Sequence, residues 1–270
     1  MTTRQRFSIQ AGAVLLMLAG SACGANAAQC SSSGGGFEGW KEDFASEARA
    51  HGVGEAGISA LMNTHYSTAT IGADRGQKSF KLSLDQFMKK RGASTIVARG
   101  RQLKRSQAAL FASLERRYGV PPGPLLAIWG METGFGAIHG NQHALSAVAT
   151  LAYDCRRSAY FTDQLYAALE LIDRGAISPN ARGSMHGEIG QTQFLPKNIL
   201  QYGTGGNLDN AGPALAATAN FLHAHGWQAG GGYQPGEANF AAIQAWNAAT
   251  VYERAIAIIG QQIDSDGAAE

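Results

Sequence analysis

A helical spacing of apolar residues runs through nearly the whole chain after residue 36, and it restricts the fold more than any other feature. Long runs of alternating apolar and polar residues, which are typical of strands, are absent from the sequence. Glycine-rich connections separate the helical segments. Helices are predicted at residues 37–50, 54–62, 94–118 and 158–174, with further helices that open at Pro124 and Pro213 and near Val251. The sequence therefore predicts a mainly α fold with little or no sheet.

The first residues have the features of a secretory signal. Arg4 and Arg6 precede a short apolar run, and Ala25-Asn26-Ala27 is a small-x-small cleavage site. The apolar run is too short to span a bilayer, so we expect removal of residues 1–27 and export to the periplasm. Lipid attachment at Cys23 is the less favoured alternative, because glycine stands three residues before it.

Charge is balanced overall but unevenly distributed. Without residues 1–27 the chain carries 20 basic and 20 acidic residues. Residues 75–117 nevertheless hold 12 Lys and Arg against 2 acids. This segment is either a solvated basic surface or a nucleic-acid patch. Export makes nucleic acid an improbable partner, and no later segment is apolar enough to be inserted in a membrane.

Two cysteines remain in the mature chain, Cys30 and Cys155. An even count in an exported protein favours one disulfide, which would tie the N-terminal segment to the body of the protein. Residues 28–36, rich in serine and glycine, are expected to be a flexible leader.

One acid, Glu132, stands in the most apolar segment of the mature chain, residues 124–136. Burial among apolar side chains disfavours the charged form, so its pKa should rise. A carboxylic acid that stays protonated near neutral pH suits general-acid cleavage of a glycosidic bond. The alternative is a structural carboxyl group that caps a helix or pairs with an arginine.

Four further segments could converge on Glu132, and each also has a structural interpretation. Ser184 and Gln193 belong either to a substrate-binding loop or to an ordinary glycine turn. Arg156 and Arg157 suit carboxylate recognition or a charged helix entrance. The other candidates are Trp246-Asn247, as a sugar-stacking pair or core packing, and Tyr118, as a groove residue or a core tyrosine.

Other chemistries find little support in the sequence. His139 and His143 have metal-ligand spacing, but Gly140-Asn141 between them argues against a helix, and the zinc-protease pattern is missing. A Gly-x-Ser-x-Gly pattern and a phosphate-binding glycine loop are also missing. We therefore expect no metal and no cofactor.

Taken together, the segments resemble the lytic murein transglycosylase B family over residues 37–262. The matching motifs occur in the family's order: Tyr118-Gly119-Val120-Pro121-Pro122, Gly130-Met131-Glu132-Thr133, Arg156-Arg157-x-x-Tyr160-Phe161, Gly187-x-x-Gly190-x-x-Gln193-Phe194-x-Pro196, Ala224-His225-Gly226-Trp227 and Trp246-Asn247. The resemblance implies a lysozyme-like helical fold with a groove for glycan strands. Within residues 37–265 we expect an N-terminal helical subdomain, 37–117, and a catalytic core, 118–265.

The resemblance also implies roles for individual residues. Glu132 would be the catalytic acid and base. Ser184 and Gln193 would orient that acid or contact the substrate, and Asn247 would lie on the substrate side, beside a tryptophan in place of the family's usual tyrosine. Groove contacts to sugar or peptide would come from Tyr118, Arg156, Arg157 and Tyr160. The acidic calcium loop of some relatives corresponds here to residues 201–210, which contain one carboxylate, so no metal is implied.

The implied reaction cleaves the bond between N-acetylmuramic acid and N-acetylglucosamine in peptidoglycan and forms a 1,6-anhydro end without water. Two alternatives remain open. A hydrolytic muramidase would need a second acid, such as Asp154 or Glu188, and Glu188 stands where relatives usually have an uncharged residue. A catalytically silent wall-binding protein would keep the groove only for docking. We expect peptidoglycan as the partner and a monomeric protein.

Overall fold

The computed structural model describes residues 28–76 and 82–265. The predicted signal peptide, with Cys23, lies outside the described residues. The elements are η1 (Gly34–Gly36), α1 (Phe37–Ala50), α2 (Glu55–Met62), α3 (Thr68–Arg75), α4 (Leu84–Arg91), α5 (Ala93–Ser106), α6 (Ala108–Tyr118), α7 (Pro122–Thr133), β1 (Gln142–His143), α8 (Ala144–Tyr153), α9 (Ser158–Asp173), β2 (Arg182–Gly183), α10 (Pro196–Tyr202), α11 (Ala211–Ala224), α12 (Phe240–Trp246) and α13 (Thr250–Asp264). The mainly α prediction is confirmed.

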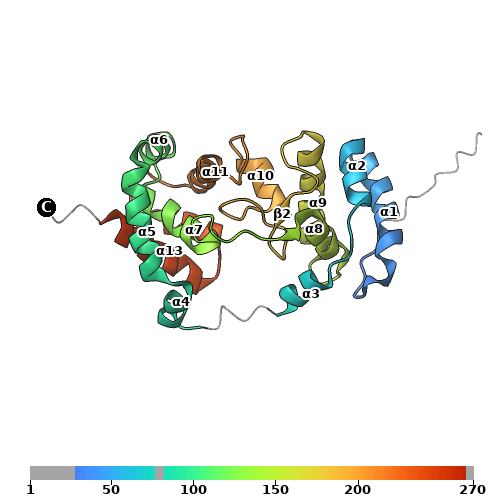
Figure 1. Ribbon diagram of the computed structural model, residues 1–270, viewed down its shortest axis with the longest axis horizontal. Helices are drawn as coiled ribbons and strands as arrows, with labels where there is room; N and C mark the ends of the chain where they lie inside the picture. Colours follow the sequence, from blue (N-terminus) through green and yellow to red (C-terminus); the bar gives the residue numbers. More distant parts are fainter. Residues whose placement is uncertain (1–27, 77–81, 266–270) are drawn as a thin grey trace, which may run out of the picture.

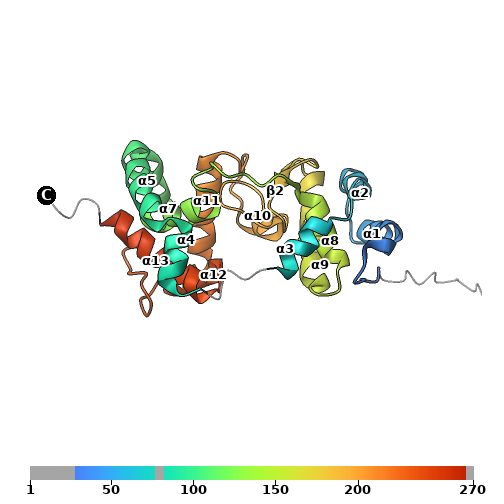
Figure 2. The same ribbon diagram turned by 60° about the horizontal axis from the view of Figure 1, so that its bottom comes forward.

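Two hydrophobic cores lie toward opposite ends of the long axis. One combines α4–α7 with α11–α13, and the other combines α1–α3 with α8 and α9. Figures 1 and 2 show these groups apart, with α10 and β2 between them. The apolar side chains of residues 37–117 are thus divided between two cores. The subdomain boundary at residue 117 stays a prediction.

Helix α7 is the central element of the first core. Ten of its side chains or glycine positions, from Gly123 to Thr133, are buried, so the helix has no polar face toward solvent. Its closest partner is α13, and α5 packs beside it (Figure 1). Gly123 and Gly260 lie at the crossing of α7 and α13, where the Gly123 N–H donates to Asp264 Oδ1 at 2.8 Å.

The strands are two residues long each and form one antiparallel pair. Gln142 pairs with Gly183 and His143 pairs with Arg182. In the described part of the chain, β1 and β2 form the one sheet. Isolated bridges also join Ser31 to Asp154 and Ile189 to Phe194. This agrees with the prediction of little or no sheet.

The N-terminal segment differs from the flexible leader that we expected. Gly34–Gly36 form a 3₁₀ helix, and Cys30 forms the predicted disulfide with Cys155. Ser31 N–H donates to Tyr153 O at 2.9 Å, and Cys155 N–H donates to Ser31 O at 3.3 Å. The disulfide and these bonds hold the segment against the end of α8.

The single helix predicted at residues 94–118 is wrong, because the chain breaks at Gln107. That residue has φ −117° and ψ 30°, which ends α5 and starts α6. The two helices then follow different neighbours, since α5 packs on α13 and α7 while α6 packs on α11. Tertiary packing thus overrides a continuous helical spacing.

Ser158, the first residue of α9, takes part in the turn that precedes this helix. Arg157 occupies the N-cap position of α9 and makes no side-chain capping bond. The Ser158 hydroxyl instead donates to Ala152 O at 2.6 Å, which fixes the turn between α8 and α9.

Within the described ranges, none of the helices combines the length and apolar character needed to cross a bilayer.

The α7–α13 crossing generates a stability prediction. In Gly123→Ala the new Cβ would collide with the carbonyl oxygen of Gly260, which is backbone and cannot rotate away. We expect the free energy of unfolding to fall by about 1–3 kcal/mol, measured by urea denaturation. In the matched control Gly72→Ala on α3 the new Cβ meets nothing within 4 Å, and helix propensity should stabilise that variant slightly. Equal stabilities of the two variants would contradict the close crossing.

Candidate active site

Glu132 lies in the last turn of α7. The helix ends because Gly134 adopts a left-handed conformation, φ 58°, in which its N–H donates to Gly130 O at 3.0 Å. The neighbours Met131 and Thr133 are buried, while Glu132 itself keeps part of its surface accessible. An acid in the last helical turn also faces the negative end of the helix dipole, which disfavours its charged form.

Two side chains donate hydrogen bonds to the same oxygen of Glu132. The Tyr252 hydroxyl of α13 lies 2.6 Å from Oε1, and the Trp246 indole N–H of α12 lies 3.3 Å from it. Trp246, which was predicted to lie near the acid, therefore supplies a hydrogen-bond donor to it. Both donors stabilise the carboxylate form of Glu132.

Desolvation outweighs these donors. Burial of the Glu132 carboxyl raises its pKa to about 7, while Tyr252, Trp246 and Arg91 act in the opposite direction and the negative charge of Glu188 adds to the rise. The elevated pKa predicted from the apolar segment is confirmed. At neutral pH a substantial share of the molecules therefore carries a protonated Glu132, as general-acid catalysis requires.

Arg91 at the end of α4 completes the wall behind Tyr252. Its guanidinium lies 5.6 Å from the Tyr252 ring centroid and 5.4 Å from that of Phe87, and it donates to Met131 O at 3.3 Å. Burial and the Glu132 charge raise the pKa of the Tyr252 hydroxyl, so this group remains a proton-bearing donor.

The loop between β2 and α10 is attached to α7 through Gln191. The Trp129 indole N–H donates to Gln191 Oε1 and the Thr133 hydroxyl donates to Gln191 O, both at 2.7 Å. Gln191 Nε2 also donates to Asp209 O at 2.7 Å. These bonds fix the loop that contains Ser184 and Gln193 beside the end of α7.

Ser184 donates to a carboxylate other than Glu132. Its hydroxyl donates to Glu188 Oε2 and accepts the N–H of His186 at 3.0 Å and of Glu188 at 3.3 Å. Glu188 in turn acts electrostatically on Glu132, Tyr252 and Tyr160. Ser184 thus reaches the environment of Glu132 through Glu188.

Arg156 and Arg157 converge on Asp74 at the end of α3. Arg156 Nε donates to Asp74 Oδ2 at 2.6 Å, and Arg157 pairs with Oδ1 of the same carboxylate. Asp74 is 4% exposed, and its two arginine partners lower its pKa against the effect of burial. Part of the carboxylate-binding capacity expected of this pair is therefore used inside the protein.

The remaining predicted residues occupy different surroundings. Tyr160 is 51% exposed. Asn247 accepts the Ala249 N–H at 3.0 Å, which shapes the turn into α13. Tyr118 is 6% exposed, and its ring lies edge-on to His223, so it is a core residue in this structure.

Gln193 has a strained backbone and lines a hollow on the protein surface. Its φ of 57° is unusual for a residue with a side chain, and its amide donates to Gly190 O at 2.9 Å. The hollow, about 500 Å³, is shared with His139, Asn180, Arg182 and Asp209. Strained residues concentrate at functional sites, which agrees with the role that the family resemblance implies.

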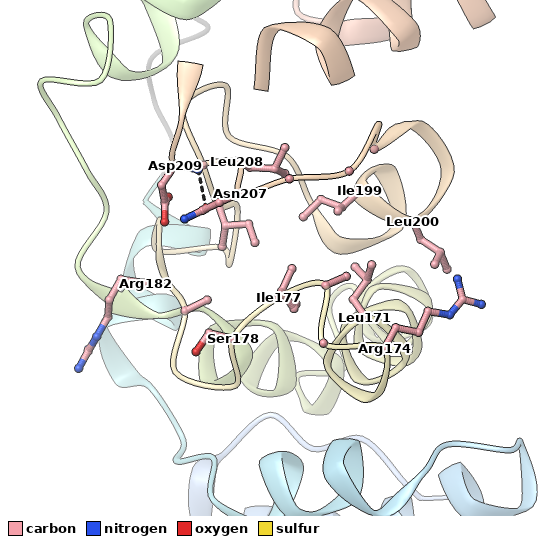
Figure 3. Close-up of a pocket in the computed structure, with 18 residues that line it drawn as sticks. Leu171, Arg174, Ile177, Ser178, Arg182, Ile199, Leu200, Asn207, Leu208 and Asp209 are labelled. Atoms are coloured by element: carbon pink, nitrogen blue, oxygen red, sulfur yellow. Dashed lines mark hydrogen bonds between the residues drawn. The ribbon is translucent and has the colours of Figure 1, made fainter. Parts of the chain in front are cut away.

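A cavity of about 570 Å³ lies away from Glu132, among the end of α9, α10 and the loop at residues 203–209 (Figure 3). Figure 3 shows an apolar lining that includes Leu171, Ile199 and Leu208, with Arg174 and Arg182 at opposite ends. The cavity adjoins the loop between β2 and α10 at Ile189 and Gly190, but Glu132 is not among its lining residues.

The sequence interpretation missed three residues that shape this site: Tyr252, Arg91 and Asp74. Tyr252 lies in the segment near Val251 that was predicted to be a helix. A buried tyrosine hydroxyl needs a hydrogen-bond partner, and that need was a usable signal. The basic segment contained Arg91 without any mark that distinguished it from its neighbours. Nothing local singled out Asp74, because its arginine partners lie about eighty positions later in the chain.

Within residues 28–76 and 82–265, no group of three or more His, Cys, Asp or Glu side chains is arranged to hold a metal ion.

Known proteins are similar to this chain in sequence and in fold. The family model described as the transglycosylase SLT domain matches residues 36–235. The chain is 37% identical over 121 residues to membrane-bound lytic murein transglycosylase B of Escherichia coli strain K12. That alignment covers 42% of this chain and 34% of the relative, so it spans about a third of the relative's length.

Solved structures extend the likeness to most of the chain. SltB3 from Pseudomonas aeruginosa, in complex with NAG-NAM-pentapeptide, is 26% identical, with a TM-score of 0.77 over 84% of this chain and 79% of that chain. SltB1 from the same organism is 20% identical, with a TM-score of 0.76 over 85% and 99% of the two chains. SltB1 shows similarity of fold. The prediction of a lysozyme-like fold of this kind is confirmed.

The raised pKa of Glu132 predicts a pH-dependent cost in stability. Between the unfolded pKa near 4.5 and the folded pKa of about 7 the unfolded chain loses this proton while the folded protein keeps it, so stability falls as pH rises through that window. Above the folded pKa of about 7, the folded protein keeps the whole loss of stability. Glu132→Gln should therefore be more stable than wild type by about 1–3 kcal/mol at pH 8 and similar to it at pH 4.5.

The measurement is urea denaturation at both pH values, with Glu42→Gln as the control. Glu42 is exposed on α1, and its variant should differ from wild type by the same small amount at both pH values. A Glu132→Gln variant with no added stability at pH 8 would contradict the buried, protonated carboxyl.

Proposed function

The chain belongs to the transglycosylase SLT domain family, and from that premise we propose that it is a lytic transglycosylase that cleaves peptidoglycan strands. The observation that carries the proposal is Glu132, a partly accessible acid with a pKa of about 7 and two hydrogen-bond donors on one oxygen. Such a group is suited both to give a proton and to take one back.

In the proposed reaction Glu132 gives its proton to the oxygen between N-acetylmuramic acid and N-acetylglucosamine. The N-acetyl group of the muramic residue assists as the bond to that oxygen breaks. Glu132, now a carboxylate, takes the proton of the C6 hydroxyl of the same sugar, and that oxygen closes a 1,6-anhydro ring. The nucleophile is intramolecular and has a high effective concentration, so no residue is needed to activate water.

The chain's own donors support both halves of this cycle. Tyr252 and Trp246 stabilise the carboxylate that exists between the two proton transfers. The likeness to SltB3 supports the same product class, since SltB3 was also solved in complex with NAG-anhNAM-pentapeptide, at 25% identity to this chain. An anhydro sugar is what the proposed ring closure forms.

Substrate contacts would come from the side chains that the family resemblance implies. Tyr160 has an exposed ring on which a sugar can stack. Arg156 and Arg157 would offer the donors that Asp74 leaves available to peptide carboxylates. We assign further contacts to Gln193, Ser184, Trp246 and Asn247. The resemblance also implies a groove contact from Tyr118, but its burial does not support that contact.

The N-terminal segment and the disulfide indicate the compartment in which the reaction would take place. We propose export to the periplasm by the N-terminal signal, and the Cys30–Cys155 disulfide suits such an oxidising compartment. The partner would be the glycan strands of the wall, bound by a monomer, with no nucleic-acid partner.

Hydrolytic muramidase activity is the second candidate. Of the two acids named for it, Asp154 is 2% exposed and pairs with Arg75 at 2.6 Å, so it is poorly placed to activate water. Glu188 is half-buried and acts on Glu132, so the candidate depends on Glu188. The intact environment of Glu132 speaks against the third alternative, a silent docking protein.

Mass spectrometry of the soluble products from purified peptidoglycan tests the proposal. Wild type should release muropeptides with 1,6-anhydro ends, one water lighter than lysozyme products. Glu132→Gln should lower the rate by about 10²–10⁴-fold, because it removes the proton donor, while Glu42→Gln should leave the rate unchanged. Reducing-end products of full mass would identify a hydrolase, and near-normal turnover by Glu132→Gln would refute the assigned acid.

A further inference from the structure

Two consecutive residues near the end of α3 hold the turn between α8 and α9. Asp74 accepts hydrogen bonds from the side chains of Arg156 and Arg157. Arg75 donates to Asp154 Oδ2 at 2.6 Å, and Asp154 Oδ1 accepts the Arg156 N–H at 3.0 Å. An acid and a base on each segment thus pair with their opposites on the other, so the turn that carries the two arginines is fixed to α3 at two points.

Asp74 occupies only part of each guanidinium group. Arg156 donates through Nε to Asp74 Oδ2 at 2.6 Å and through Nη2 to Asp74 O at 3.0 Å, and Arg157 donates through Nη2 to Oδ1. In the part of the chain that the structure describes, neither Nη1 has a hydrogen-bond partner or is enclosed, and the two side chains are 47% and 36% exposed. Two positive charges face one buried carboxylate, so the pair has donors and charge left for a second anion.

The arginine pair lies beside side chains that belong to the candidate site. The Arg157 guanidinium is 4.8 Å from the Phe161 ring centroid, and that ring lies edge-on to Tyr160, with centroids 5.1 Å apart. On another side, His186 Nε2 lies 3.9 Å from Asp74 Oδ1, on the loop between β2 and α10. Asp74 therefore lies where α3, the start of α9 and this loop meet.

We propose that Asp74 is a positioning residue for substrate binding: it holds Arg156 and Arg157 so that their remaining donors bind a carboxylate of the peptide attached to the glycan strand. This inference rests on the proposed function and deepens it. A free arginine has many side-chain conformations, and binding must select one of them. Because the buried Asp74 fixes both side chains beforehand, the substrate does not bear that loss of entropy.

The negative charge of Asp74 has an opposite effect, since it also repels a substrate carboxylate. Its removal would raise the net positive charge of the cluster. The exposed sides of the arginines face water, however, where solvent and salt weaken the action of a distant charge. The paired hydrogen bonds of an arginine to a carboxylate depend on geometry, which is lost when the side chain is free. We therefore expect the loss of positioning to outweigh the gain in charge.

The test is a binding measurement by isothermal titration calorimetry in a Glu132→Gln background, which blocks turnover. One ligand is NAG-NAM-pentapeptide, and the other is the same molecule with its carboxylates converted to amides. The background protein should bind the carboxylate form about 5–30-fold more tightly than the amide form. Asp74→Asn should remove most of this preference and leave the affinity for the amide form unchanged, which shows that the variant is folded.

Kinetics give a second readout with the Glu132 acid intact. On strands that carry stem peptides, Asp74→Asn should raise KM by a factor similar to the lost binding preference and leave kcat nearly unchanged, because the arginines do not touch the reacting atoms. Arg156→Gln combined with Arg157→Gln should have the same effect, and adding Asp74→Asn to that pair should change KM no further. Asp74→Glu, which keeps the charge, should retain more of the preference than Asp74→Asn.

Asp173→Asn is the matched control. The Asp173 carboxylate also joins α9 to an N-terminal helix, since it accepts the N–H groups of Gly54 at 2.6 Å and Gly57 at 2.7 Å at the start of α2. It lies at the other end of α9 from the arginine pair. Its variant should be less stable in urea denaturation but keep the full preference for the carboxylate form.

Three results would overturn the inference. One is an equal loss of affinity for both ligands in Asp74→Asn, or the same loss of preference in Asp173→Asn, because either indicates a general structural role. Another is tighter binding of the carboxylate form by Asp74→Asn, since Asp74 would then compete with the substrate. The third is the lack of any preference in the background protein. Binding with this preference but without anhydro products from wild type would refute the proposed function alone.

Discussion

The hydrogen bond between Tyr252 and Glu132 joins the two helices on which the rest of the site depends. Glu132 lies in the last turn of α7 and Tyr252 in the first turn of α13, and a 2.6 Å hydrogen bond joins them. Gly123 and Gly260 bring the same two helices close together farther along. Around this contact the apolar core raises the pKa of the acid, while the tyrosine and Trp246 limit the rise. The balance leaves a carboxyl group that can both give and take a proton near neutral pH.

The same balance explains why this site is costly to the fold. A carboxyl that resists ionisation destabilises the folded protein at the pH where the protein is expected to work. The arginine pair shows a related compromise, because Asp74 is buried and needs both Arg156 and Arg157 as partners. Glu132 and the arginine pair are thus held by partners inside the protein. Burial of these charged or ionisable groups lowers the stability of the fold, and the two hydrophobic cores stabilise it.

The helical spacing, the apolar surroundings of Glu132 and the even cysteine count predicted the mainly α fold, the raised pKa and the disulfide. These features depend on local pattern or composition. The break at Gln107 and the placement of the N-terminal segment depend on which distant surfaces each helix meets, and the chain carries no local mark of either. Tyr252 and Asp74 were missed for the same reason, since their partners lie about 120 and 80 residues away. Ser184 was predicted to lie near Glu132, yet its hydroxyl donates to Glu188.

The central claim is that Glu132 keeps its proton near neutral pH, between desolvation and the donors on Oε1. A ¹³C NMR titration of the Glu132 carboxyl in wild type and in Tyr252→Phe measures this balance directly. An apparent pKa of about 7 in wild type, and a higher value once the tyrosine donor is removed, is the result that the account requires. A wild-type value near 4.5, or a value that does not move in Tyr252→Phe, would contradict it.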